Sequence, residues 1–215
     1  GKMQAERNIN YLLLHNLNDD LVLICGGQYT SDNDRFCEIF SKSSHFSLKT
    51  EKIKLSINAE NDIIRNLDDK HFLIIDNFKH ALYEYSLENY SINYEMPLPE
   101  NISKIENLIV FNNNILFFID TYGKYYWFDY KNRKKLYEGD LKQRYFNAVS
   151  NNNTVFISGG TSIAHGISDF YDADRSVFEC SIQNMNCVKT GSLGMPRARH
   201  KAVFLDDNNI FYAGG

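Results

Sequence analysis

The 215-residue sequence lacks the features of several large protein classes. No apolar stretch approaches the ~18 residues of a membrane span, and the first ten residues have no apolar core of a signal peptide. No stretch keeps a helical apolar period over three turns, which leaves room for almost no helix. Basic residues are scattered apart from 131–135, and the formal net charge is −4, so we expect neither a nucleic-acid nor a membrane partner.

Cysteine is also scarce, with four residues and no CxxC pair. This usage lacks the density of a disulfide scaffold, which indicates a reducing compartment and predicts a cytoplasmic location. Cys25 lies in an apolar run and is expected in the core. Cys180 and Cys187 bracket a predicted turn, so a disulfide between them is the alternative to the favoured free thiols.

What the sequence does contain is a repeated hairpin unit. Each copy has an apolar run, an Asn/Asp-rich turn, a second apolar run, and then Gly-Gly or an Asp in its place. Asn and Asp tolerate the left-handed backbone of tight hairpin turns, so each unit predicts two antiparallel strands. The five copies cover 12–27, 63–77, 107–121, 146–160 and 201–215, with turns at 18–20, 68–70, 112–114, 151–153 and 206–209.

A second hairpin with aromatic residues on both sides of a polar turn follows each of the first four units. Four strands per repeat, named A to D here, account for nearly all of the chain. The period of roughly 40 to 55 residues is typical of a four-stranded propeller blade. The sequence therefore predicts one all-β domain, 1–215, with repeats at about 10–58, 59–103, 104–143, 144–194 and 195–215.

The last repeat junction resembles the kelch repeat. "GMPRARHKAVFLDDNNIFYAGG", preceded by "GG…FYDADRSVF", has a glycine pair ending strand B, a Tyr-Asp, an aromatic residue some seven positions on, and a Met-x-x-x-Arg-His lead into the next blade. Elsewhere the pattern is weaker, since Asp76 and Asp120 stand where the first glycine belongs. The resemblance implies a kelch-type β-propeller of four blades plus the terminal hairpin of a fifth, belonging to a longer propeller.

If the chain is such a propeller, its repeated residues are expected to have structural roles. The glycine pairs serve close backbone approach and positive φ rather than phosphate binding. In kelch-like blades the Arg-His position joins neighbouring blades, which assigns that role to Arg197, Arg199 and His200. The half blade has open edges, which we expect to pair with missing downstream sequence or with another copy. Equivalent strand-B residues expected to pack between blades are Leu23, Ile74, Phe117, Phe156 and Phe211.

No chemistry is evident from motif spacing. The histidines have no HxH or HExxH spacing and no G-x-S-x-G elbow occurs, so we predict no catalytic residue, no metal ligand and no cofactor. A site at a propeller axis, built from one residue per blade, would escape this argument. A sugar-processing or oxidase propeller is therefore the alternative to the favoured non-enzymatic interpretation.

The favoured function is protein–protein interaction through loops held by rigid sheets. The B–C loops are predicted at 28–34, 77–80, 121–124 and 161–168, and the D–A loops at 58–62, 97–104, 139–144 and 191–197. Cationic or hydrogen-bonding residues there suit an acidic protein or peptide. The candidate partner-binding residues are Arg35, Lys79, Lys124, Arg144, His165 and Arg197. Many kelch-like proteins recruit substrates to ubiquitin ligases through an added BTB domain, and no BTB-like segment lies in these residues, so the resemblance implies the recognition half of that role.

Overall fold

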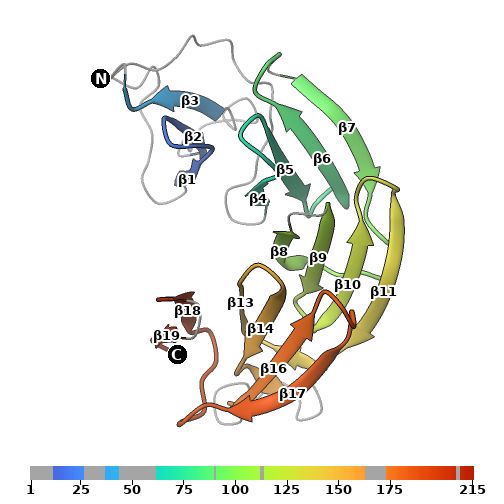
Figure 1. Cartoon of the computed structure of the whole chain (residues 1–215), viewed down its shortest axis with the longest axis vertical. Helices are drawn as coiled ribbons and strands as arrows, with labels where there is room; N and C mark the ends of the chain where they lie inside the picture. The colour runs from blue at the N-terminus through green and yellow to red at the C-terminus, as the bar shows by residue number, and fades with distance from the viewer. Residues whose placement is uncertain are drawn as a thin grey trace. The chain divides into compact units, whose positions relative to one another are not determined.

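The computed structural model describes residues 12–26, 37–43, 62–89, 91–111, 114–162, 173–206 and 209–215. Within these ranges the chain forms strands, turns and irregular segments without a helix, which confirms the predicted all-β class (Figure 1). The described residues accordingly contain no helix that could span a membrane. The chain divides into two compact units, Gly1–Glu100 and Asn101–Gly215. Their antiparallel sheets fit a β-propeller-like fold.

The described part of the first unit holds a three-stranded and a four-stranded sheet, both with neighbouring strands in chain order. The strands of the first are β1 (Leu12–Asn16), β2 (Leu21–Gly26) and β3 (Cys37–Ser41). Those of the second are β4 (Ile63–Asn66), β5 (His71–Asp76), β6 (Ala81–Ser86) and β7 (Ser91–Pro97).

Among its described residues, the second unit holds two four-stranded sheets, a two-stranded hairpin and a short two-stranded pairing. One sheet contains β8 (Ile105–Phe111), β9 (Ile115–Asp120), β10 (Lys124–Asp129) and β11 (Lys134–Asp140). The next contains β13 (Asn147–Ser150), β14 (Thr154–Ser158), β16 (Ser176–Ser181) and β17 (Cys187–Ser192). The hairpin is β18 (Lys201–Phe204) with β19 (Ile210–Ala213), and the short pairing joins β12 (Gln143–Arg144) to β15 (Thr161–Ser162).

The A–B hairpin turns form where the Asn/Asp pattern predicts them, because a side-chain oxygen caps the turn amides. Asn18 Oδ1 accepts hydrogen bonds from the Asp20 and Leu21 amides at 3.0 and 2.8 Å. Asp68 and Asn151 act in the same way in the corresponding turns of their sheets. The two remaining predicted turns, 112–114 and 206–209, are described only in part, because residues 112–113 and 207–208 lie outside the described residues. These local bonds are Asx-turns, which explains why the turns could be read from the sequence.

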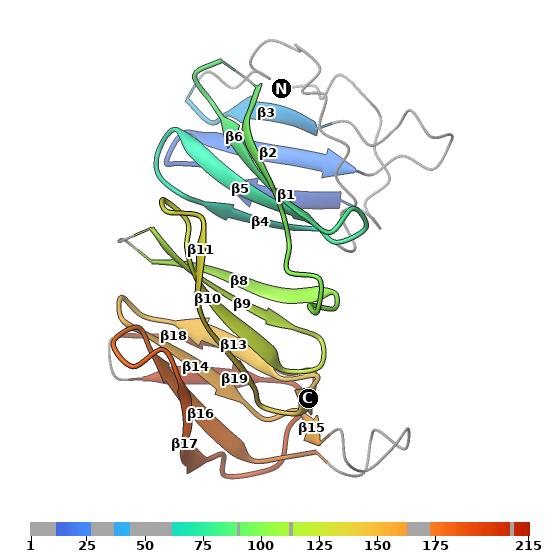
Figure 2. The ribbon, with the colours of Figure 1, turned by 90° about the vertical axis from the view of Figure 1, so that its right-hand side faces the viewer.

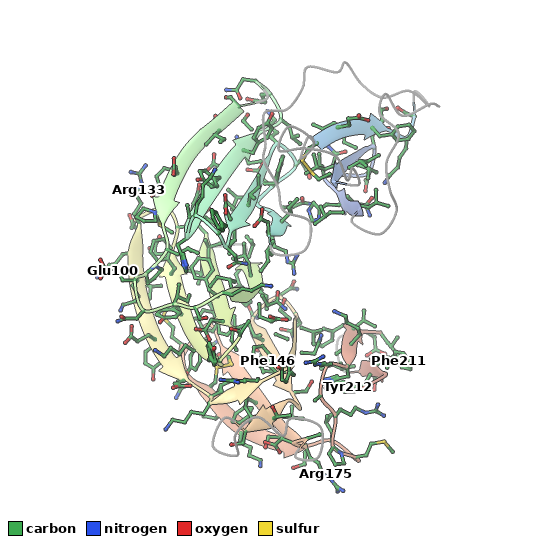
Figure 3. The ribbon with its side chains drawn as sticks, turned by 180° about the vertical axis from the view of Figure 1, so that it is seen from behind. Glu100, Arg133, Phe146, Arg175, Phe211 and Tyr212 are labelled. Atoms are coloured by element: carbon green, nitrogen blue, oxygen red, sulfur yellow. A yellow bond between two sulfur atoms is a disulfide. The ribbon has the colours of Figure 1, made fainter. Side chains whose placement is uncertain are left out.

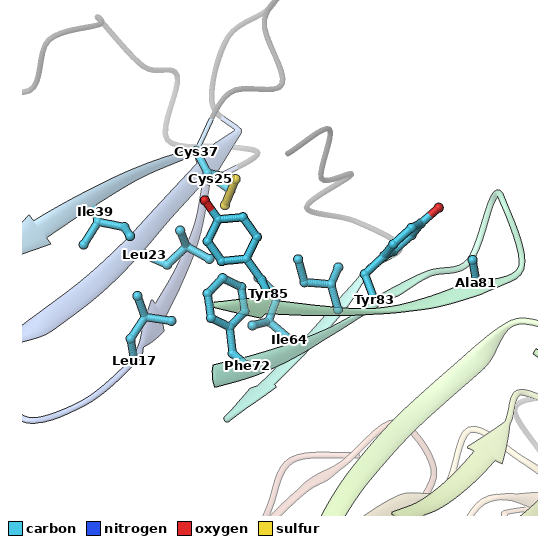
Figure 4. Packing of buried hydrophobic residues seen from close by; sticks show 11 residues of the cluster. Leu17, Leu23, Cys25, Cys37, Ile39, Ile64, Phe72, Ala81, Tyr83 and Tyr85 are labelled. Atoms are coloured by element: carbon cyan, nitrogen blue, oxygen red, sulfur yellow. A yellow bond between two sulfur atoms is a disulfide. The ribbon is translucent and has the colours of Figure 1, made fainter. Parts of the chain in front are cut away.

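Aromatic and aliphatic side chains from both sheets of the first unit form one core (Figure 4). Leu23 from β2 and Phe72 from β5 are fully buried there, and the Phe72 and Tyr85 rings lie 5.0 Å apart. Burying each such side chain contributes about 1.5–3 kcal/mol before entropy is counted. The two sheets are thus held together by their facing apolar residues, and Asn66 of β4 adds hydrogen bonds of 2.9 Å to the His15 side chain and to the Asn16 carbonyl of β1.

The second unit has an equivalent core between its two four-stranded sheets. Trp127 of β10 is fully buried, with its ring 4.9 Å from that of Phe117 and 5.5 Å from that of Phe111. Val155 and Ile157 of β14 close this core from the other sheet. The amide of Cys187 donates a hydrogen bond of 3.0 Å to Tyr125 Oη, which ties β17 to β10.

The predicted set of equivalent strand-B residues is wrong at Ile74, and two of its other members are less buried than expected. Counted back from the strand ends Asp76 and Asp120, Leu73 corresponds to Phe117, whereas Ile74 points to the opposite face. Every residue of β5 from Phe72 to Asp76 is buried. Apolar and polar residues therefore do not alternate along this strand, and its sequence could not show which residues share a face with Phe117. Phe156 is only half-buried against Phe204, and Phe211 is 52% exposed, so neither is packed as fully as predicted.

The prediction of free cysteines is also wrong. Cys25 pairs with Cys37 and Cys180 with Cys187, with Cα atoms 4.1 and 4.0 Å apart. Each pair occupies directly opposite positions on adjacent antiparallel strands, where the close Cα spacing permits a bridge. Disulfides persist mainly in oxidising compartments, so the cysteine argument for a cytoplasmic location no longer holds. The prediction that Cys25 is buried is confirmed at 0% exposure.

Candidate functional site

Four of the six candidate partner-binding residues lie in the described part of the chain. Lys79 belongs to the first unit, whereas Lys124, Arg144 and Arg197 belong to the second. Arg35 and His165 lie outside the described residues, as do the B–C loop 28–34 and most of the loop 161–168.

In the first unit the B–C turn after β5 is folded around a carboxylate. Asp76 Oδ1 accepts hydrogen bonds from the amides of Phe78 and Lys79, at 3.0 and 2.9 Å. Lys79 Nζ lies 3.5 Å from Asp76 Oδ2 and 5.7 Å from the centroid of the Tyr83 ring. Burial, followed by the nearby charge of Glu95, raises the pKa of Tyr83 to about 12, so this ring stays neutral. The turn holds Phe78 outward, with 88% of its surface exposed.

The B–C turn after β9 in the second unit is built in the same way. Asp120 Oδ1 accepts hydrogen bonds from the amides of Tyr122 and Lys124, at 2.9 and 3.0 Å. Tyr122 is 41% exposed and occupies the position of Phe78, two residues after the carboxylate. Lys124 borders a shallow pocket of about 220 Å³ whose other lining residues are Asn101, Tyr126, Glu138, Gly139 and Asp140.

Arg144 of β12 lies on the exposed aromatic residue of this second turn. Its Cζ atom is 4.3 Å from the centroid of the Tyr122 ring, a cation–π distance. The Arg144 Nε atom is buried and has no hydrogen-bond partner among the described residues. The stacking orients the guanidinium group, so less side-chain entropy is lost when its outer N–H groups bind an anion.

A second stacked pair follows directly along the chain. The Cζ atom of Arg199 lies 4.2 Å from the centroid of the Tyr145 ring, and the Arg199 amide donates a 2.7 Å hydrogen bond to the Tyr145 carbonyl. Both residues have positive φ, 54° in each case. A left-handed backbone conformation is about 1–2 kcal/mol less stable for residues other than glycine, so the contacts around Tyr145 and Arg199 must stabilise it.

The glycine pair and the Arg-His segment join the sheet of β13–β17 to the hairpin, as predicted. Gly159 and Gly160 have φ of 61° and 99°, and the Gly160 amide donates a 2.7 Å hydrogen bond to the Arg197 carbonyl. A Cβ on Gly159 would collide with that carbonyl, so the approach requires glycine. Arg197 Nη1 donates a hydrogen bond of 2.5 Å to the Gly214 carbonyl, so its side chain already has a structural contact. His200, 2% exposed, hydrogen-bonds through Nε2 to Ser158 Oγ at 3.0 Å.

The buried His200 makes stability depend on pH. Burial, then the charges of Arg197 and Lys201, lower its pKa below the usual 6.5. The folded state keeps the ring neutral while the unfolded chain protonates near pH 6.5, so this contribution is present above pH 6.5 and is lost as the pH falls toward the folded-state pKa. We expect His200→Gln to lose less stability than the wild type between about pH 8 and about pH 5, measured by urea denaturation. Equal pH dependence in both proteins would contradict this assignment.

The sequence placed the candidate cations on loops but missed the exposed aromatic residues beside them. Phe78 and Tyr122 each stand two residues after the Asp that ends strand B, a spacing visible in "DNFKH" and "DTYGK". Comparing these two segments directly would have identified both. Among the described residues no cluster of three or more His, Cys, Asp or Glu side chains could hold a metal ion.

No family model and no curated protein sequence match this chain. A solved structure described as a novel fungal alcohol oxidase with catalytic diversity among the AA5 family, in complex with copper, is similar to it. The match has a TM-score of 0.71 at 13% identity and covers 99% of this chain and 50% of that chain, so this chain spans half the length of the oxidase chain. Likeness at this identity shows the fold alone. Membership of the kelch family is not confirmed and stays a prediction, while an all-β, propeller-like fold is shared.

Proposed function

We propose that this chain is a protein-interaction module that binds an acidic protein or peptide segment through its inter-strand loops. In this proposal its sheets are successive blades of a kelch-type propeller, in keeping with the resemblance of the last repeat junction. A more specific version of this proposal is that the chain recruits a substrate protein to a ubiquitin ligase. The observation that carries the proposal is the repeated B–C turn that exposes an aromatic residue next to a cation.

Hydrogen bonds within each turn restrict its backbone before any partner binds. The carboxylates of Asp76 and Asp120 each accept two amide hydrogen bonds from their own turn, which leaves few conformations to the residues between. An aromatic ring held outward on such a turn loses little entropy when a partner covers it. Phe78, with 88% of its surface exposed, has no packing role that would explain its position.

The cations at these turns favour an acidic partner. Arg144 lies on the Tyr122 ring, whereas Lys79, which follows Phe78 in sequence, has its Nζ atom 3.5 Å from Asp76 Oδ2. Aromatic residues and Arg are enriched among residues that dominate binding energy, and Arg binds carboxylates through two parallel hydrogen bonds. A peptide with Asp or Glu next to an apolar side chain would satisfy both groups at one turn.

The test is selection of binders from a random peptide library displayed on phage, followed by affinity measurements on purified variants. We expect acidic and apolar residues to be enriched, and Tyr122→Ser or Arg144→Gln to weaken binding of a selected peptide about tenfold, equivalent to about 1.4 kcal/mol. Tyr137→Ser is the matched control, because Tyr137 is 40% exposed on the outer strand β11, away from the turns. Neutral or basic selected peptides, or equal losses from Tyr122→Ser and Tyr137→Ser, would refute the proposal.

An oxidase is the second candidate, supported by the description of the similar fungal structure. Its test is hydrogen peroxide production from a panel of primary alcohols and sugars after loading with copper. Stoichiometric copper binding together with turnover would favour the enzyme over the interaction module.

A further inference from the structure

The pocket beside Lys124 is formed by one end of the β10–β11 hairpin. It has a volume of about 220 Å³ and lies where β10 begins and β11 ends, whereas the turn that contains Arg133 joins the opposite ends of these strands (Figures 2 and 3). Asn101 lines it from the segment before β8, and the other lining residues all belong to β10 or β11. Strand pairing within one sheet therefore sets the shape of this pocket.

The register of the two strands places opposite charges across the pocket without joining them. Lys124 lies directly opposite Asp140, and Tyr126 directly opposite Glu138, so these side chains share one face of the sheet. The Cβ atoms of such opposite residues are about 4.5–5.5 Å apart, close enough for an ion pair. Among the described residues, however, no ion pair joins Lys124 to Asp140, and Glu138 pairs with Lys135 instead. The Lys124 ammonium group therefore keeps its hydrogen-bonding capacity for a ligand.

Tyr126 supplies a polar group held by a buried ring. Only 3% of its surface is exposed, but its hydroxyl group stays accessible and has no hydrogen-bond partner among the described residues. Burial, followed by the charges of Glu138, Asp120 and Asp140, raises the pKa of Tyr126, so the hydroxyl group keeps its proton and can donate. Because packing already fixes the ring, a ligand that binds this group loses little side-chain entropy.

The mixed charge of the lining favours a neutral ligand. An anion would meet Glu138 and Asp140, whereas a cation would meet Lys124. A hydroxyl group avoids both penalties, because it accepts a hydrogen bond from an ammonium group and donates one to a carboxylate. Two hydroxyl groups on neighbouring carbon atoms can thus bridge Lys124 and Asp140, while the Asn101 amide and the Tyr126 hydroxyl group offer donors and acceptors for others.

The size of the pocket limits the ligand to one small unit. Pockets for drug-sized ligands measure about 300–1,000 Å³, and this one is smaller, at about 220 Å³. A single sugar ring carries several neighbouring hydroxyl groups within a compact, neutral body. It therefore meets both the chemical and the size requirement.

We propose that the pocket between β10 and β11 binds one monosaccharide unit of a carbohydrate. Vicinal hydroxyl groups of the sugar bridge the Lys124 ammonium group and the Asp140 carboxylate, and further hydroxyl groups bind Tyr126 and Asn101. This site does not depend on the acidic-peptide function proposed above, whose test uses Tyr122 and Arg144.

The test is titration of the isotope-labelled full chain with methyl glycosides of the common hexoses, followed by the chemical shifts of the backbone amides. We expect at least one glycoside to bind with a dissociation constant of about 1 mM, because a shallow polar pocket holds a single sugar weakly. The shifts should be confined to amides around Lys124, Tyr126, Gly139 and Asp140. The vicinal diol of cyclohexane should shift the same amides, whereas cyclohexanol, which lacks the second hydroxyl group, should not.

Variants then assign the individual contacts. Asp140→Asn and Lys124→Met should each weaken binding of the best glycoside about tenfold. Asp140→Asn keeps the oxygen that accepts the Lys142 amide at 2.7 Å, so the turn is retained while the charge is lost. Tyr126→Phe removes only the phenol oxygen and should weaken binding about threefold. Tyr137→Phe is the matched control, because it removes the same group from the opposite face of the hairpin.

Unchanged amide shifts in the wild type at glycoside concentrations of about 50 mM would overturn the proposal without any variant, so a folding defect cannot hide a failure. Tighter binding of a zwitterionic amino acid than of every glycoside would also overturn it, as would equal weakening by Tyr126→Phe and Tyr137→Phe. Asp140→Asn separates this site from the peptide site, because it should weaken glycoside binding without weakening a selected acidic peptide. A glycoside that keeps its affinity for Asp140→Asn would refute the assigned contact and with it the proposal.

Discussion

Replacing Phe117 with alanine is expected to lower the free energy of unfolding by about 3–5 kcal/mol, whereas Phe211→Ala should lower it by less than about 1 kcal/mol. The two residues hold the same strand-B position, three residues before Asp120 and Gly214. Phe117 is fully buried, and its ring lies 4.9 Å from that of Trp127 and 5.8 Å from that of Tyr125. Phe211 is half exposed, so its removal creates no closed cavity.

Urea denaturation followed by tryptophan fluorescence measures both losses, because the single tryptophan, Trp127, reports on the core that contains Phe117. Phe156→Ala, at a half-buried equivalent position, should fall between the two. A large loss from Phe211→Ala would mean that something covers the outer face of the β18–β19 hairpin in solution. A small loss from Phe117→Ala would contradict the packing of the second unit's core.

Removing the two disulfides is the second large expected effect. Cys25→Ala/Cys37→Ala and Cys180→Ala/Cys187→Ala should each cost about 2–3 kcal/mol, since cross-linking limits the unfolded chain over loops of this size. The bridged residues are 12 and 7 positions apart, so the first bridge, which closes the longer loop, should contribute slightly more. Alanine is used because Cys25 and Cys180 are fully buried and serine would add an unpaired hydroxyl group.

The measurement is thermal unfolding with and without dithiothreitol. The wild-type melting temperature should fall on reduction, while a variant with all four cysteines replaced should melt at the same temperature in both conditions. Mass spectrometry of the alkylated, non-reduced protein provides the check on connectivity. Detection of a pair of free thiols in protein purified under oxidising conditions would contradict the bridge between those two cysteines.

Local features of the fold could be predicted from sequence because their causes lie within a few residues. Asn18, Asp68 and Asn151 each cap amides two or three positions away, and such bonds form whatever packs on the hairpin. The positive φ values of Gly159 and Gly160 are also local features that the glycine pair itself predicts. Apolar runs on both sides of these turns then led to the antiparallel strand pairs.

Sequence reasoning failed where a residue's environment depends on a neighbouring sheet. β5 is buried on both faces, so no alternation separated Leu73 from Ile74 as the equivalent of Phe117. The bridge between Cys25 and Cys37 arises because the register of β2 with β3 sets the two residues opposite each other. Motif spacing carries no information about that register.

The sequence alone determined the all-β class, the repeated hairpins, their turns, and the structural role of the glycine pairs and of His200, because these follow from alternation, turn chemistry and a repeated motif. Only the tertiary structure decided the disulfides, the stacking of Arg144 on Tyr122, the outward position of Phe78, and the contrast between buried Phe117 and exposed Phe211. Strand pairing and sheet packing join residues distant in sequence, and the burial of a side chain depends on which residues of the neighbouring sheet pack against it. The same side chain on the same repeat position is therefore core in one sheet and surface in another.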